Sequence, residues 1–496
     1  MTSYYEKGIF DMTKNTATDI DGKPYHRSLL VMVLLIGTFC TMLNQTILAT
    51  AFPKLMQEFK VTPSTIQWLT TGFMLVMGIM IPISAWIFNR FKTKRIYLLA
   101  MVLFLVGTIV CYLSTNFPML LIGRLIQSVA VGILVPMVQT IMLTIFPPEK
   151  RGTAMGLSGM VIGLAPAIGP TLSGYIIDHF VWRDLFGMII PIVIVVLVLA
   201  SIFMKNVLPN SKPKLSIPSV ILSTLGFGLL LYGFSSVGDH GWTSKIVLIS
   251  LFVGFVFVII FSIYQLKMSN PFLDLKVFKQ WRFTLGILLS SIVYMMMIGV
   301  EMVLPMYIQN IRGQSAFNSG LLLLPGAILI GIMMPITGRV FDKYGAKRLA
   351  VTGLFISTLA TVPLVFLTTE TPLLLMTISY AIRLFGISMV MMPLTTYGMN
   401  ALPNELISHG SAVNNTVRQI MGSVGTAVLF SVLSNTTSKQ MPSQSLMSNN
   451  ILEFKTQEIN ALLRGYESAF FVSAIFGLIA LIMTIFLKDN KNKRGN

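Results

Sequence analysis

One carboxylate lies well inside an otherwise apolar stretch of this chain. Glu301 stands in Val-Tyr-Met-Met-Met-Ile-Gly-Val-Glu-Met-Val-Leu-Pro, residues 293–305. An ionised carboxylate is costly in hydrocarbon, so such groups face a protein interior and mark functional sites. Burial favours the neutral form, which makes Glu301 a candidate to bind and release a proton. The alternative is an acid near the end of its span that extends to water or pairs with a base.

Three arginines, Arg124, Arg383 and Arg418, also fall inside long apolar stretches. Intramembrane bases either take part in function or pair with backbone carbonyls at helix ends. For Arg124 both interpretations stay open, whereas Arg383 and Arg418 are interpreted as structural.

Several other kinds of chemistry are not supported. The chain has no GxxxxGK[ST] stretch for a nucleotide phosphate, and its four histidines are dispersed without metal-ligand spacing. Cys40 and Cys111 both lie in apolar stretches, which argues against a disulfide framework. We therefore predict no nucleotide, no metal and no cofactor.

The composition places these residues in a membrane. Of the 496 residues 54% are hydrophobic and only 11% charged, and the mean hydropathy is +0.78. Continuous apolar runs of about twenty residues indicate membrane-spanning helices rather than the alternating strands of a barrel. The chain is therefore predicted to be an all-α polytopic protein of the lipid bilayer. Fourteen spans are expected near residues 29–51, 66–88, 96–115, 118–145, 153–177, 184–204, 216–236, 245–267, 283–308, 318–338, 349–368, 373–397, 410–433 and 466–487.

The basic residues set the expected orientation. Roughly 25 of the 36 fall on one side of this span map and about 8 on the other, as the positive-inside rule requires of cytoplasmic loops. The net charge of +18 is thereby explained without nucleic acid. We expect both termini in the cytoplasm, with tails at 1–28 and 489–496, and a polar extracellular loop at about 434–464.

Four features recur at sequence offsets between 253 and 259, each in the equivalent loop or span, which indicates a duplicated six-helix bundle. The first bundle is expected at 29–204 and the second at 282–488, with two inserted helices and their flanking loops at 205–281. The recurring pairs are the loop motifs beginning at Asn89 and Asp342, Arg124 with Arg383, Gly152-Thr153-Ala154 with Gly410-Ser411-Ala412, and Asn44 with Glu301.

The fifth span carries prolines among small residues. Its segment contains Gly163, Pro166, Gly169, Pro170 and Gly174. Small residues let helices approach closely, and prolines are tolerated in a membrane helix where neighbours satisfy the freed backbone groups. We predict a bent, closely packed helix whose bend helps the two halves to seal.

These motifs resemble those of the major facilitator superfamily, and fourteen spans resemble its drug:proton antiporter branch, the EmrB/QacA type. The resemblance covers almost the whole chain after residue 28. It implies two six-helix bundles plus two inserted helices. The motifs that carry it are Leu43-Asn44-Gln45-Thr46 with Ala51-Phe52-Pro53, Arg124-Leu-Ile-Gln127 with Gly132, Pro148-Glu-Lys-Arg-Gly152, the 163–174 segment, and Asn270-Pro-Phe-Leu-Asp-Leu-Lys276.

The resemblance also assigns roles. It implies proton coupling at Arg124. The family commonly has an acid at the position of Asn44, and an asparagine cannot carry a proton. Glu301, the counterpart of Asn44 in the second half, is therefore expected to carry the proton instead. Asn89 departs in the same way from the acid that normally begins the first loop motif. The gating loops are expected at Asn89, Arg90, Arg95, Asp342, Lys343 and Arg348. The expected substrate-binding residues are Asn44, Gln45, Trp68, Gln127 and Tyr294.

The main hypothesis is a monomeric secondary transporter of a bacterial cell membrane that exports amphiphilic compounds or drugs in exchange for protons, by alternating access. The alternative is a flippase or exporter of a lipid, glycolipid or single dedicated metabolite on the same fold. A membrane enzyme acting on lipid-linked substrates is the third reading. It would need a catalytic cluster, and its one candidate is Asp178, His179, Arg183 and Asp184.

Overall fold

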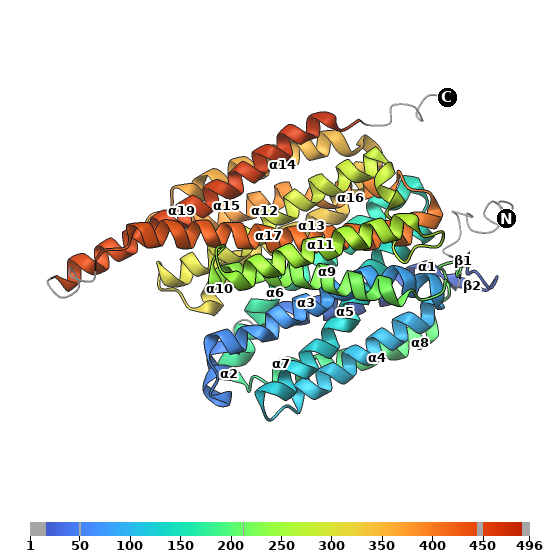
Figure 1. Ribbon diagram of the computed structural model, residues 1–496, viewed down its shortest axis with the longest axis horizontal. Helices are drawn as coiled ribbons and strands as arrows, with labels where there is room; N and C mark the ends of the chain where they lie inside the picture. Colours follow the sequence, from blue (N-terminus) through green and yellow to red (C-terminus); the bar gives the residue numbers. More distant parts are fainter. Residues whose placement is uncertain (1–15, 49–50, 212, 444–449, 489–496) are drawn as a thin grey trace.

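The computed structural model describes residues 16–48, 51–211, 213–443 and 450–488. The side chains of residues 16, 63, 64, 166, 167, 170, 239 and 316 are outside this description. Within the described residues, 13 helices are long and apolar enough to cross a membrane. Helix α6 (Arg151–His179), part of which lies outside the described side chains, occupies the place of the predicted fifth span. The helices form one elongated bundle with both chain ends on the same side (Figure 1). We call that side the terminus-bearing end.

The first half of the bundle contains six long helices and two short ones. Proline or a polar cap begins several of them; Asn116, for example, accepts from the backbone N–H of Met119. The helices are α1 (Arg27–Thr46), α2 (Phe52–Phe59), α3 (Pro63–Arg90), α4 (Thr93–Tyr112), α5 (Phe117–Ile145), α6, α7 (Asp184–Gly187) and α8 (Ile189–Phe203).

The second half repeats this arrangement with one broken span. The predicted twelfth span, 373–397, is interrupted at residues 389–390 and forms two helices. Its helices are α12 (Trp281–Asn310), α13 (Ala316–Tyr344), α14 (Ala346–Val365), α15 (Leu373–Ser388), α16 (Met391–Met399), α17 (Ile407–Gln440) and α19 (Ile451–Met483). Short 3-10 turns, η3 (Pro148–Lys150), η4 (Leu275–Lys279), η5 (Asn404–Leu406) and η6 (Thr484–Phe486), lie beside helix ends.

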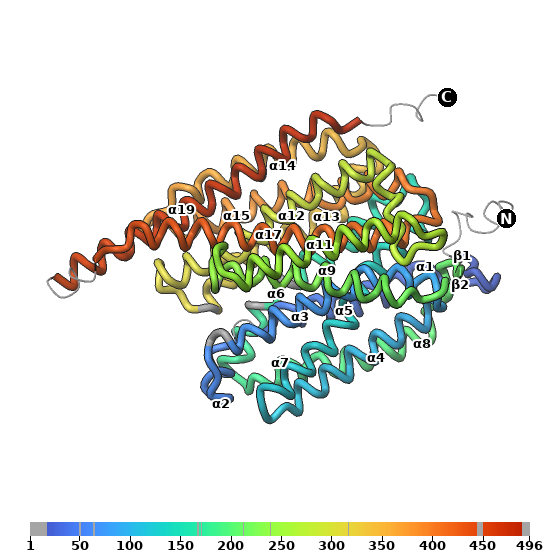
Figure 2. Tube along the Cα trace, in the orientation of Figure 1, coloured from blue at the N-terminus to red at the C-terminus, as the bar shows by residue number. Residues whose placement is uncertain are grey.

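The inserted helices α9 (Ile217–Ser235) and α11 (Lys245–Lys267), with the short α10 (Val237–His240) between them, form a hairpin. Helix α9 packs against both α3 and α17, and α11 packs mainly against α9. The pair therefore covers one of the two seams at which the halves meet (Figure 2). The indole of Trp242 also donates to Ser431 Oγ at 2.8 Å, which fixes the hairpin to α17.

The two seams are related by the duplication. At one, α6 of the first half packs on α13 of the second; at the other, α17 packs on α3. The α6–α13 seam is built on glycine, because a Cβ at Gly156 would lie 2.5 Å from the carbonyl oxygen of Met334. Such backbone-to-backbone contact is how helices associate in lipid, where no hydrophobic force drives them together.

A short β-hairpin precedes the first helix, which the prediction of a plain tail did not include. Strands β1 (Thr16–Thr18) and β2 (Pro24–His26) pair antiparallel. Asp19 Oδ1 accepts from the backbone N–H groups of Asp21 and Lys23, and Gly22 supplies the positive φ of the turn. The hairpin is held to the first half because Asn206 Nδ2 donates to Asp21 Oδ2 at 3.1 Å.

The segment at 434–464, predicted as a polar extracellular loop, is helical to Gln440 in α17 and again from Ile451 in α19. Helix α17 has 34 residues and α19 has 33. At 1.5 Å per residue each is about 50 Å long, well beyond the roughly 30 Å of a hydrocarbon core. The two helices project together from the end opposite the termini (Figure 1). Polarity led us to expect a loop outside the membrane, but polarity does not exclude helix, because helix formation is compatible with a solvated surface.

Candidate functional site

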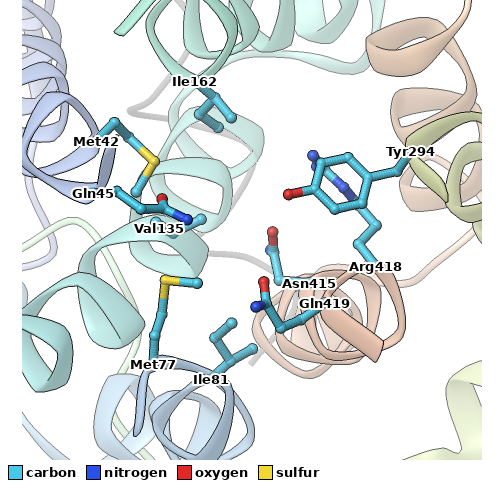
Figure 3. A pocket seen from close by; sticks show the side chains of 10 residues that line it. All are labelled: Met42, Gln45, Met77, Ile81, Val135, Ile162, Tyr294, Asn415, Arg418 and Gln419. Atoms are coloured by element: carbon cyan, nitrogen blue, oxygen red, sulfur yellow. The ribbon is translucent and has the colours of Figure 1, made fainter. Parts of the chain in front are cut away.

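A small cavity lies between the two halves (Figure 3). Its volume is about 50 Å³, whereas sites for drug-sized ligands are usually about 300–1,000 Å³. A ligand of that size therefore requires the halves to separate. The lining residues come from four helices of the first half and two of the second: Met42, Gln45, Met77, Ile81, Val135, Ile162, Tyr294, Asn415, Arg418 and Gln419.

One face of α17 contributes much of the polar lining of the cavity. Ser411, Asn415 and Arg418 follow helical spacing and so share that face. Ser411 Oγ donates to the carbonyl of Pro136 at 3.0 Å, and Asn415 Nδ2 donates to Gln139 Oε1 at 2.8 Å. This polar stripe joins α17 to α5 across the halves. The sequence analysis missed it, although polar residues three and four apart in an apolar span were the available signal.

Arg124 is fully buried and closes the end of α1. Its Nη1 donates to the carbonyl of Asn44 at 2.9 Å and to Gln127 Oε1 at 3.1 Å, and its guanidinium lies 4.2 Å from the centroid of the Phe73 ring. Helix α1 ends at Thr46, so the Asn44 carbonyl has no partner within the helix. These contacts favour the structural one of the two roles left open for Arg124.

Arg383 occupies the equivalent position in the second half. Its Nη2 donates to the carbonyl of Met296 at 2.6 Å and its Nε to Thr361 Oγ1 at 3.2 Å. A threonine hydroxyl accepts a hydrogen bond in both halves. In the first half the donor to Thr108 Oγ1 is Gln127, which lies beside Arg124. Arg383 thus contacts backbone and hydroxyl groups, as the structural interpretation expects.

Arg418 differs from that interpretation. It is 5% exposed, and its Nε and Nη1 have no hydrogen-bond partner among the described residues. Its guanidinium lies 4.6 Å from the centroid of the Tyr294 ring, and both side chains line the cavity (Figure 3). Arg418 therefore belongs to the cavity rather than to a helix end.

Glu301 is half-buried on α12, two helical turns from Tyr294 on the same face. Arg383 and Tyr380 of α15 are its electrostatic neighbours. The three ion pairs found within the described residues all lie elsewhere, so Glu301 is not held in a salt bridge. A carboxylate near a cation but not tied to it can change its protonation without breaking a bonded pair.

At the terminus-bearing end, Asp342 fastens the second half to the first. Its Oδ1 accepts from the backbone N–H of Gly152 at 2.8 Å, and its Oδ2 accepts from the N–H and Oγ1 of Thr153 at 2.8 and 2.7 Å. These groups begin α6, where free N–H groups and the helix dipole favour an anion. We call this contact the Asp342 clasp.

Asn89 makes the equivalent contact at the other seam. Its Oδ1 accepts from Ser408 Oγ at 3.2 Å, and its Nδ2 lies 3.2 Å from His409 Nε2. Ser408 and His409 are in the first turn of α17. The contact lacks the charge of the Asp342 clasp. Both loop motifs thus join the halves at the same end of the bundle.

The remaining residues of the two gating loops lie on the surface around these contacts. Arg90 is in the last turn of α3, Arg95 in the first turn of α4, Lys343 in the last turn of α13, and Arg348 near the start of α14. All four are exposed.

The small residues of the 163–174 segment face two different helices, α1 and α13. Gly169 packs against Thr46 of α1, Gly174 against Phe317 of α13, and Gly163 faces Met334 with more room, at 3.6 Å from its Cε. Helix α6 is continuous from Arg151 to His179. The side chains of Pro166 and Pro170, on which the predicted bend depends, lie outside the described residues.

The expected substrate residues divide between the cavity and other sites. Gln45 and Tyr294 line it. Asn44 is fully buried with both side-chain polar atoms unpartnered among the described residues, and Gln127 is bound to Arg124. Trp68 instead stacks on Tyr232 of α9, with ring centroids 6.1 Å apart, and is 40% exposed. Its position ties the inserted hairpin to α3.

The cluster considered for an enzyme contacts residues close to it in the chain and residues of other segments. Arg183 donates to Glu58 Oε1 at 2.9 Å and to the carbonyl of Ser114, Asp184 accepts from the N–H of Val181, and His179 contacts the carbonyl of Tyr175. These contacts hold the loop between α6 and α8. Asp178 is exposed beside them.

A duplicated all-helical bundle with a cavity between its halves defines a secondary transporter of the major facilitator type. Residues 34–426 match the family model described as Major Facilitator Superfamily. The chain belongs to that superfamily and is a multi-pass membrane protein.

Named relatives and a solved structure agree with this assignment. The chain is 39% identical to lincomycin resistance protein LmrB of Listeria innocua, over 93% of this chain and 97% of that one. It is 30% identical to the multidrug export protein EmrB of Escherichia coli, over 82% and 80% of the two chains. The human organic anion transporter MFSD10 shares the fold, with a TM-score of 0.65 at 14% identity, over 92% and 99%.

Removing the charge of the Asp342 clasp is expected to loosen the terminus-bearing end. In the wild type the two carboxylate oxygens of Asp342 accept three hydrogen bonds, and Asp342→Asn leaves only one accepting oxygen. Hydrogen bonds to charged groups contribute about 1.5–3 kcal/mol. We expect faster labelling of a cysteine at buried Ser411 by a membrane-impermeant maleimide, by about tenfold or more. Cys40 and Cys111 are both buried and give little background.

Glu149→Gln is the matched control for that experiment. It removes an equal charge from the exposed turn just before α6, where Glu149 has no hydrogen bond in the described structure. The cysteine at position 411 should be labelled clearly faster in the Asp342 variant than in the Glu149 variant. Equal labelling rates in the Asp342 and Glu149 variants would show that the clasp does not hold this end closed.

Proposed function

We propose that this protein exports amphiphilic or drug-like small molecules across the bacterial cell membrane in exchange for protons. The observation that carries the proposal is the cavity between the halves, which residues of both halves line. Support comes also from its relatives, which include a lincomycin resistance protein and a multidrug export protein. Methionine, isoleucine and valine side chains on one side of the cavity suit variable apolar bodies.

Alternating access is supported by where the halves are joined. The Asp342 clasp and the Asn89 contact both close the terminus-bearing end. Positive-inside topology places that end in the cytoplasm. In this conformation the cavity is separated from the cytoplasm, and rocking of the halves about the two seams would open it there.

Proton coupling is assigned to Glu301. The residue is half-buried on a cavity-lining helix and has a cationic neighbour without an ion pair in the described structure. Protonation from outside and release inside would change its interaction with Arg383. A ligand or proton shifts a conformational equilibrium only by its differential interaction with the two states. Glu301 is the acid on α12 that supplies such a difference, and we propose that the monomer is sufficient.

A panel experiment tests the proposal. Inverted vesicles containing the protein should take up several unrelated amphiphilic dyes when the lumen is acidified, and a protonophore should stop the uptake. Vesicles prepared without the protein are the control. Unrelated dyes should compete with one another. Uptake that ignores the proton gradient would refute antiport, and uptake of one compound without competition would indicate a dedicated exporter or flippase.

A further inference from the structure

We propose that the cavity binds the anionic group of an amphiphilic substrate, such as a carboxylate, sulfonate or phosphate, on the guanidinium of Arg418. This inference rests on the proposed function and names the class of substrate for the same site. It goes beyond the general expectation of drug export, because it predicts discrimination between ligands of the same shape and different charge.

Arg418 is buried, and the described structure does not give it the hydrogen-bond partners that a buried charge normally has. The side chain is 5% exposed, and two of its three nitrogens, Nε and Nη1, have no hydrogen-bond partner among the described residues. Burying a cation without a partner is strongly unfavourable, and a charge of this kind is normally paired or hydrogen-bonded. Arg124 illustrates the normal case, since it donates to backbone carbonyls and has no unpartnered nitrogen among the described residues; Arg383 donates to a carbonyl and leaves one nitrogen, Nη1, without a partner there.

The described residues around Arg418 in the cavity carry no negative charge. No acidic side chain is among the ten described residues that line the cavity, whose polar members are Gln45, Tyr294, Asn415, Arg418 and Gln419. Glu301 lies two turns along α12 from Tyr294, roughly 10 Å by helix rise. Glu301 is not among the residues that line the cavity, and no ion pair joins it to Arg418 in the described structure. The cavity therefore has a positive charge without a built-in counter-ion.

Polar groups surround the guanidinium of Arg418 on one side of the cavity, and apolar side chains lie on the other. In Figure 3 the amides of Asn415 and Gln419 and the hydroxyl of Tyr294 point into the same space as the guanidinium group, opposite Met42 and Ile162. A guanidinium presents paired donors that match the two oxygens of a carboxylate or a sulfonate. The Gln419 amide and the Tyr294 hydroxyl add donors beside it, whereas Asn415 Nδ2 already donates to Gln139 Oε1. The apolar wall suits the rest of an amphiphile. Charge, donors and wall together select an anionic amphiphile over a cationic one.

The test compares two dyes that share a skeleton. 1-Anilinonaphthalene-8-sulfonate differs from N-phenyl-1-naphthylamine by its sulfonate, so the ratio of their affinities reports recognition of the anion. We would measure both by equilibrium dialysis against the full-length protein in nanodiscs, with empty nanodiscs subtracted. The sulfonate dye is expected to bind at least about tenfold more tightly, equivalent to about 1.4 kcal/mol.

Two variants assign the preference to the cavity. Arg418→Gln should reduce the affinity ratio to about one while changing the affinity for the neutral dye less than twofold. Gln419→Glu keeps the shape of a lining residue and places a carboxylate beside Arg418, so it too should remove the preference. Arg282→Gln removes an equal charge from the exposed first turn of α12 and should leave the ratio unchanged.

The outcomes separate this proposal from the general one. A preference that persists in both Arg418→Gln and Gln419→Glu, or a wild-type ratio near one, would overturn it, even if dyes are exported. If the ratio behaves as expected but no export is seen, the cavity binds anions and the proposed transport function fails instead. Thermal unfolding of each variant identifies misfolding, and Gln419→Glu supplies the answer if Arg418→Gln does not fold.

Discussion

Glu301→Gln is expected to abolish proton-driven export while leaving the fold and dye binding intact. Glutamine has the shape of the protonated acid but cannot lose a proton, so the variant stays in one charge state. Without a change of charge beside Arg383, a proton gradient has no differential interaction by which to shift the two conformations. We expect gradient-driven uptake in inverted vesicles to fall by about tenfold or more, which corresponds to about 1.4 kcal/mol of lost coupling.

The readout must separate coupling from binding. Substrate exchange without a gradient, measured with labelled dye on one side, should continue in Glu301→Gln because exchange needs no net proton movement. Glu370→Gln is a matched control, since Glu370 is an exposed acid in the loop before α15. Full gradient-driven uptake by the Glu301 variant would remove Glu301 from the mechanism. Loss of exchange as well as uptake would assign it to the conformational change itself.

Gly156→Ala is expected to have a large effect on folding relative to the size of the change. The added methyl would lie 2.5 Å from the carbonyl oxygen of Met334, a backbone atom held in α13, and 3.0 Å from the Cα of Pro335. Neither atom can move without shifting the helix. Overpacking of this kind costs about 1–3 kcal/mol, so the free energy of unfolding should fall by that amount and the α6–α13 seam should widen.

Gly163→Ala is a closely matched control. It is the same substitution on the same helix against the same partner residue, but the new methyl would lie 3.6 Å from Met334 Cε, the end of a flexible side chain. Alanine also favours helix over glycine by up to about 1 kcal/mol. Thermal unfolding in detergent should therefore lower stability only for Gly156→Ala. Equal effects of the two substitutions would show that the seam tolerates displacement.

Much of the fold was predictable because lipid imposes strong constraints on a chain. Long apolar runs had to be helices, since an unsatisfied backbone group in hydrocarbon is costly. The recurrence of Arg124 as Arg383 indicated two bundles, and each arginine donates to a backbone carbonyl of the first long helix of its own half. Polarity alone was a weaker guide. It did not predict the β-hairpin at 16–26 or the helical extension of α17 and α19.

The candidate site was only partly predictable. Glu301 could be singled out because a carboxylate within an apolar run is rare and expensive. Gln45 and Tyr294, which were expected to bind substrate, line the cavity, whereas Trp68 belongs to the contact with α9. The contact between α17 and α5 could not be predicted, because its residues are far apart in the sequence. Asn415 and Gln139 are 276 residues apart in the chain, and only their hydrogen bond reveals that α17 and α5 meet.

The sequence by itself determined that this chain spans a membrane as two related helical bundles, and it pointed to one acid within the apolar region. The physical reason is that hydrophobicity, charge bias and duplication are properties of composition and order. Which polar groups find partners depends on the packing of distant helices. Only the tertiary structure decided that Arg383 is bound to a carbonyl, that Asp342 begins a helix of the other half, and that Arg418 faces the cavity between the halves.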